Sequence, residues 1–178
     1  MQYPKPFITK FVILVISGGK ITLDACKTLA HALITSQLDY GNALRYGFPS
    51  TLMTRIQKVQ KFSARLVTHT HKREHITPIL NSLHWLPVIY RSQYKILMYT
   101  FKALQGTVPQ YLEELVVLYQ PTMSLRSETG AFLAGNICFR KAAATLWNNL
   151  LVTIIKCKTL DISKKEIKTN LFVSAFPS

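Results

Sequence analysis

The residues best suited to chemistry in this sequence are cations that recur at helical spacing between positions 50 and 69. At 100° per residue, four of them fall within about 120° of one helix face and span about 15 Å of its length. Phosphates on one strand of a duplex follow one another about every 3.4 Å along the axis, so this face matches several of them. The spacing predicts binding to a phosphate backbone. The four cations are Arg55, Lys58, Lys61 and Arg65.

Further cations follow along the chain. The next loop contains Lys72 and Arg73, with three histidines that gain charge below neutral pH. The helix expected after this loop adds Arg91 and Lys95 beside an arc of aromatic and aliphatic residues. Those aromatic residues either stack on exposed bases or belong to the core, and the core is the interpretation we favour.

A solvated outer helix face is the alternative interpretation of the cations. Such a face usually mixes charges of both signs, because oppositely charged side chains one turn apart stabilise a helix. Residues 51–73 contain no carboxylate, and residues 51–102 contain nine Lys and Arg but only one acid, Glu74. This one-sided composition favours an anionic partner.

The whole chain is basic, with a net charge of +14 over 178 residues. Nucleic acids and anionic membrane surfaces are the partners that such a charge favours. A membrane is the less expected of the two, because the apolar run Phe11–Ile16 is far shorter than the ~20 residues of a membrane span. This run is predicted to be a buried strand or a helix turn, with the strand preferred, and it only weakly imitates a signal peptide. Three unpaired cysteines favour a reducing, intracellular location, nuclear or cytoplasmic.

No pattern in the sequence predicts catalysis. The eight acidic residues are scattered, no two aspartates are adjacent, and the phosphate-binding, nucleophile-elbow and zinc-protease motifs are absent from the sequence. The spacing His69-x-His71-x-x-x-His75 lacks a fourth metal ligand. We therefore expect a non-enzyme with no metal, cofactor or small-molecule substrate.

The expected fold is mostly α, an irregular bundle of about six helices. Apolar periodicity, caps and prolines place these helices, with Thr22, Ser50 and Thr77 as N-caps and Gly106 as a C-terminal cap. The expected helices are Thr22–Leu38, Ser50–His69, Pro87–Leu104, Gln110–Leu118, Ala142–Leu150 and Ile162–Phe172, with a short helical turn over Ile79–Leu83.

From about residue 21 onward, the sequence resembles the region that follows the polymerase core in non-LTR (LINE-type) retrotransposon reverse transcriptases. The resemblance begins with Asp24–Leu44 and Tyr46–Pro49, and it is most specific over Lys72–Pro87 (KREHITPILNSLHWLP). It continues through shorter matches. These are Tyr94–Leu97, Phe101–Leu104, Pro109–Leu112, Ser124–Ser127 and Ala142–Asn148.

The resemblance implies a helical thumb and its downstream extension, in contact with template–primer or with the element's own RNA. It supports Arg55, Lys58, Arg65, Lys72 and Arg73 as backbone contacts. Catalysis is not carried over, because the aspartate pair of the palm and the endonuclease lie upstream in the family. The implied partners are RNA or an RNA/DNA duplex and the upstream polymerase domains of a parent protein.

The same resemblance suggests a division of the chain. Residues 1–20 do not match, 21–126 form the thumb-like region, 127–141 an irregular loop and 142–178 a C-terminal helical region. Histidine stands at positions 69 and 71 where the family usually has arginine, as in a decayed copy. We expect a non-catalytic C-terminal fragment of a retrotransposon RNA-directed DNA polymerase that binds nucleic-acid backbone. The alternative is a helical protein-interaction module, or a decayed product without activity.

Overall fold

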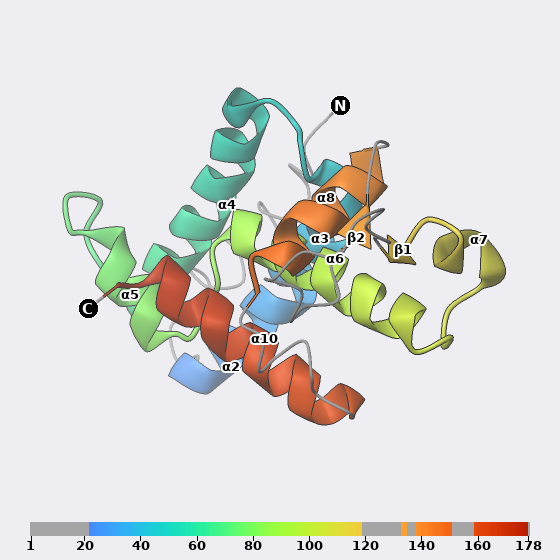
Figure 1. The fold of residues 1–178 in the computed structure, drawn as a ribbon. Helices are drawn as coiled ribbons and strands as arrows, with labels where there is room; N and C mark the ends of the chain where they lie inside the picture. The colour runs from blue at the N-terminus through green and yellow to red at the C-terminus, as the bar shows by residue number, and fades with distance from the viewer. Residues whose placement is uncertain (1–21, 119–132, 135–137, 151–158, 178) are drawn as a thin grey trace. The chain divides into compact units, whose positions relative to one another are not determined.

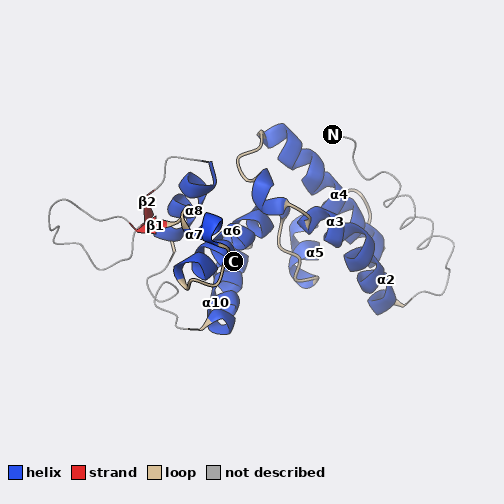
Figure 2. Cartoon of the chain, turned by 90° about the vertical axis from the view of Figure 1, so that its right-hand side faces the viewer, coloured by secondary structure: helices blue, strands red, loops and turns tan. Residues whose placement is uncertain are grey.

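Helices dominate the computed structural model, which describes residues 22–118, 133–134, 138–150 and 159–177. The predicted mostly α, irregular helical fold is confirmed (Figures 1 and 2). The α-helices are α2 (Leu23–Ala30), α3 (Ser36–Asp39), α4 (Ser50–Thr68), α5 (Ile76–Ser82), α6 (Val88–Leu104), α7 (Gln110–Glu113), α8 (Cys138–Asn148) and α10 (Leu160–Ala175). The other elements are the π-helical turn η1 (His31–Thr35), the 3-10 turn η2 (Asn42–Arg45) and the strands β1 (Val117–Leu118) and β2 (Leu133–Ala134).

The described chain forms two compact units. The first contains α2 to α5 and ends at Arg91, and the second contains residues 43–47 and everything described from Ser92 onward. The chain therefore passes from one unit to the other within α6, whereas the division expected from the sequence keeps residues 21–126 together. Helix α8 begins at Cys138, so the end of the expected 127–141 loop is helical. The unmatched segment 1–20 and its predicted strand lie outside the described residues.

The first unit is built on a helix that begins where the sequence predicts. The hydroxyl of Thr22 accepts a hydrogen bond from the Ala25 N–H at 3.4 Å, which caps α2. The helical path continues through η1 and α3 to Asp39, so the predicted helix over 22–38 is confirmed with a π-helical turn inside it. Helix α4 packs against α2, η1 and α5.

The structure corrects several predicted helix caps and boundaries. Pro49, rather than Ser50, is the N-cap of α4. Helix α5 begins at Ile76, so Pro78 lies inside its first turn, where no intrahelical N–H bond is lost. Helix α7 ends at Glu113 instead of residue 118, because Val117–Leu118 pairs antiparallel with Leu133–Ala134. Short β-branched runs such as Val116–Val117 suit a strand as well as a helix.

The C-terminus of α4 closes through a histidine in the left-handed backbone region. His69 has φ 53°, the Thr70 N–H donates to the Arg65 carbonyl at 3.1 Å, and the His69 N–H donates to the Leu66 carbonyl at 3.5 Å. These bonds form a Schellman cap, in which glycine usually takes the left-handed position. His84 has the same φ after α5 and is exposed. A histidine at this position carries a steric cost that glycine avoids.

Replacing His69 by glycine is therefore expected to raise the free energy of unfolding by about 1 kcal/mol. Urea denaturation followed by circular dichroism measures this change. The control is His71→Gly in the same loop, where the backbone lies outside the left-handed region and glycine brings no gain. A His69→Gly protein no more stable than the natural one would contradict the prediction.

The second unit buries part of the apolar arc of α6. Ile96 packs with Ala142 and Ala143 of α8, and the Phe101 and Trp147 rings lie 6.4 Å apart. Phe101 is buried together with the aliphatic Leu97 and Met98, so this aromatic residue belongs to the core, as we favoured. Tyr90 and Tyr94 of the same arc are only half-buried. The C-terminal helix α10 contributes the buried side chains of Ile167 and Leu171.

Candidate nucleic-acid interface

Helix α4 has one buried face and one basic face. Ile56, Gln60, Ser63, Ala64 and Val67 are buried, and all five lie within about 100° of one another at 100° per residue. The four cations predicted from the sequence lie on the opposite side of the helix. Arg55 and Lys58 are exposed, whereas Lys61 and Arg65 are half-buried. The predicted basic helix face is therefore present on α4.

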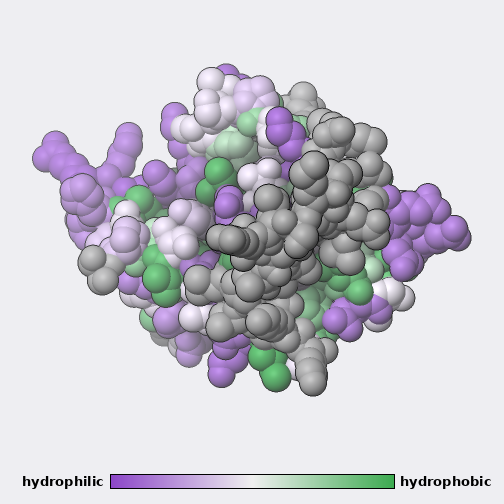
Figure 3. Space-filling view, in the orientation of Figure 1, coloured by the Kyte–Doolittle hydropathy of each residue, from purple (hydrophilic) through white to green (hydrophobic). Residues whose placement is uncertain are grey.

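The loop after α4 continues this charge. Lys72 and Arg73 are exposed, and one Nη of Arg65 donates to the Glu74 carbonyl at 3.0 Å, which ties the loop to the helix. The Glu74 carboxylate accepts from the His71 N–H at 3.3 Å. Figure 3 shows hydrophilic side chains on the left of the view, where Figure 1 places the loop between α4 and α5. We name Arg55, Lys58, Lys61, Arg65, Lys72 and Arg73 the α4 basic surface.

None of these six cations is neutralised within the part of the chain that the structure describes. The ion pairs found there are Lys27–Asp24, Arg91–Asp39 and Lys164–Asp161. Each pair joins residues outside the α4 basic surface. Within the described residues, the side chains of Arg55, Lys58, Lys61, Lys72 and Arg73 form no hydrogen bond or ion pair, whereas Arg65 uses one Nη on the Glu74 carbonyl.

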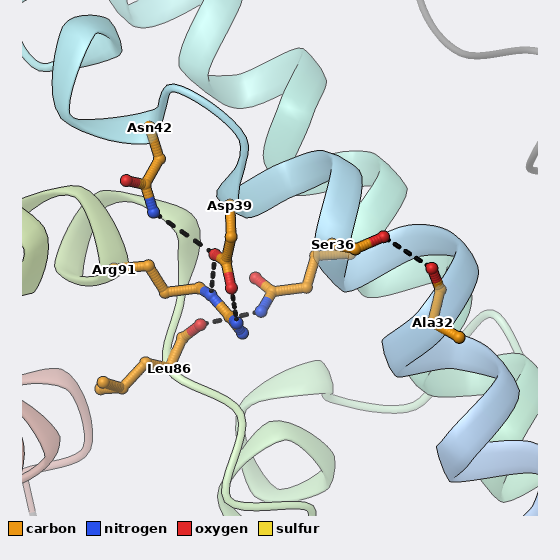
Figure 4. A network of polar contacts seen from close by, with 7 residues as sticks. Ala32, Ser36, Asp39, Asn42, Leu86 and Arg91 are labelled. Carbon is orange, nitrogen blue, oxygen red and sulfur yellow. Dashed lines mark hydrogen bonds and ion pairs between the residues drawn. The ribbon is translucent and has the colours of Figure 1, made fainter.

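Arg91 does not belong to the basic surface, although the sequence predicted it as a nucleic-acid contact. Its Nε and Nη2 donate to the two carboxylate oxygens of Asp39 at 2.8 and 2.6 Å (Figure 4). The Asn42 side-chain amide donates to the same carboxylate at 3.3 Å. The Arg91 side chain is only 18% exposed. We therefore remove Arg91 from the predicted set, because a bidentate pair already satisfies its guanidinium.

His31 lies beside this pair. Burial lowers its pKa below the ordinary value, the nearby Arg91 lowers the pKa further, and Asp39 raises it. The imidazole meets the Trp85 ring edge-on at 5.4 Å.

Lys95 belongs to the second unit, where it is half-buried on α6. It lies one helical turn after Arg91, as the sequence predicted, but Arg91 is paired with Asp39. The two residues therefore do not form the second basic stripe that their spacing predicted. We leave Lys95 outside the α4 basic surface.

Phe62 is a residue of the basic face that our sequence reasoning missed. Its side chain is 46% exposed, and it stands four residues after Lys58 and three before Arg65. Helical spacing alone places Phe62 on the same side as the cations. The signal was present in the sequence, in which this phenylalanine breaks the apolar periodicity of the helix.

The described residues contain no cluster of three or more His, Cys, Asp or Glu side chains that could hold a metal ion. In the same part of the chain, no helix is both long enough and apolar enough to cross a membrane. No protein-family model matches the sequence, and comparisons with curated proteins and with solved structures find no match.

Proposed function

We propose that this protein binds the phosphate backbone of RNA or of an RNA/DNA duplex through the α4 basic surface. The observation that carries the proposal is a row of six cations on one helix and its following loop, none paired with a carboxylate among the described residues. A polyanion gains most from such a row, because each bound cation releases condensed counterions.

Backbone contact, rather than reading of bases, suits the side chains on this surface. Asparagine and glutamine are the usual partners of adenine edges. The glutamines of α4, Gln57 and Gln60, bond to each other and to the segment Leu86–Val88. The surface therefore offers cations rather than free side-chain amides, and such cations position a nucleic acid through its phosphates.

The family resemblance supports the same role. Its most specific run, Lys72–Pro87, begins at the loop cations of the basic surface and ends just before α6. We propose that the chain acts as a non-catalytic C-terminal fragment of a LINE-type reverse transcriptase. The sequence has no adjacent aspartate pair for polymerisation.

The salt dependence of binding tests this proposal. Four to six neutralised phosphates predict a log–log slope of the binding constant against salt of roughly −3 to −5. Fluorescence anisotropy with a labelled RNA and with an RNA/DNA duplex measures the slope. A binding constant that does not change with salt, or no binding at low salt, would reject the proposed function.

A further inference from the structure

Phe62 presents an apolar ring in the middle of a charged helix face. Its side chain is 46% exposed, although the apolar residues Ile56, Ala64 and Val67 of the same helix are buried. Lys58 and Arg65 stand one turn before and after it. On a helix, side chains at these spacings have Cβ atoms about 5–6 Å apart, so both cations are neighbours of the ring.

An aromatic ring among unpaired cations suits one class of ligand in particular. Proteins that bind single strands combine a positively charged track for the backbone with aromatic side chains on which bases stack. Stacking needs an unpaired base, because a duplex hides base faces inside its own stack. Phosphates on Lys58 and Arg65 would leave a base between them free to cover Phe62.

We infer that Phe62 is a base-stacking platform and that the α4 basic surface takes a single-stranded segment. This inference rests on the proposed function and deepens it, because it names unpaired nucleic acid as the substrate class. One base stacks on the Phe62 ring while the flanking phosphates lie on the cations. The surface then binds single strands more tightly than blunt duplexes of equal length.

Three probes of equal length test the inference: a labelled oligouridine RNA, an oligo(A)·oligo(U) duplex, and an abasic sugar–phosphate chain. Phe62→Ala is expected to weaken binding to the single strand about tenfold. The affinity of Phe62→Ala for the duplex stays unchanged, as does the salt dependence of its binding to each probe, because the cations remain. The natural protein binds the abasic chain about as weakly as Phe62→Ala binds the RNA.

Two variants serve as controls. Phe62→Tyr keeps the ring and is expected to keep the affinity for the single strand. Tyr111→Ala removes a more exposed ring, 66% exposed, which stands two and three residues before Glu113 and Glu114. Because its charged neighbours on the same short helix and turn are acidic, its removal is expected to leave binding unchanged.

The outcomes separate the two proposals. If the natural protein binds neither RNA nor duplex, both proposals are overturned. A second outcome is that the natural protein binds both RNA and duplex with a steep salt slope, and that Phe62→Ala binds each of them as well as the natural protein does. Backbone binding then stands and stacking is overturned. The same result is expected if Phe62 instead contacts a protein partner. Equal weakening toward all three probes also overturns stacking, because the loss then does not depend on a base.

Discussion

Replacing Arg55, Lys58 and Lys61 together by glutamine should weaken binding to a short RNA about 100- to 500-fold at 0.1 M salt. The magnitude follows from counterion release. Each phosphate contact contributes about 0.7 for single strands, or 0.9 for duplexes, to the slope of the logarithm of the binding constant against the logarithm of the salt concentration. At 0.1 M salt, one such contact therefore raises the binding constant by a factor of roughly 5 to 8. The loss of three contacts multiplies these factors to about 100- to 500-fold, and it lowers the magnitude of the salt slope by about 2 to 3.

These three positions separate binding from folding. Arg55 and Lys58 are exposed, Lys61 is half-buried, and none forms a side-chain hydrogen bond or ion pair within the described chain. Glutamine has nearly the same helix propensity as lysine and arginine, so α4 is expected to remain helical. Arg65 is left unchanged, because it holds the Glu74 carbonyl at 3.0 Å.

A matched control removes three charges elsewhere. Lys141 on α8 and Lys165 and Lys168 on α10 are exposed and belong to the second unit. Changing all three to glutamine lowers the net charge equally but leaves the α4 basic surface intact. Anisotropy titrations compare the two triple variants. Equal weakening by both would show that total charge, rather than the α4 surface, drives binding.

Replacing Gln60 by leucine should lower the free energy of unfolding by about 2–3 kcal/mol. Gln60 is 2% exposed, and its amide donates to the Leu86 carbonyl at 2.8 Å. Its carbonyl accepts from the Gln57 amide at 2.8 Å, and Gln57 in turn accepts from the Val88 N–H at the start of α6. Leucine has a similar size but leaves the buried Leu86 carbonyl and the Gln57 amide without these partners.

Gln110→Leu is the matched control for this change. Gln110 is exposed, and its amide donates to the Glu114 carboxylate at 3.0 Å on the surface. Water replaces a lost bond there, so we expect a change within about 0.5 kcal/mol. Urea denaturation of both variants measures the difference. A Gln60→Leu protein as stable as the natural one would show that the buried amide chain contributes little.

Much of the α4 basic surface could be predicted from the amino-acid sequence. The cations repeat at helical spacing, and residues 51–73 lack carboxylates, so both the face and its unbalanced charge can be read from consecutive residues. The helix over 22–38 and its Thr22 cap were predictable for the same reason. Such features depend on neighbours within one or two turns, and the regular geometry of the helix positions them.

Contacts between distant residues decided the rest. Arg91 has the spacing of a second basic stripe, but its guanidinium donates two hydrogen bonds to the carboxylate of Asp39, which stands 52 residues earlier. In the sequence, nothing distinguishes Gln60 from other polar residues of a helix. The folded chain brings the Leu86 carbonyl within hydrogen-bonding distance of its side-chain amide. Val117–Leu118 becomes a strand because Leu133–Ala134 pairs with it.

Periodicity along the chain thus specified which cations share a helix face, because side-chain direction on a helix follows from residue number. Whether a given cation stays available depends on which carboxylate or carbonyl the folded chain brings within hydrogen-bonding distance. No local pattern carries that information, since a partner such as Asp39 reaches Arg91 only when its own helix has packed in place.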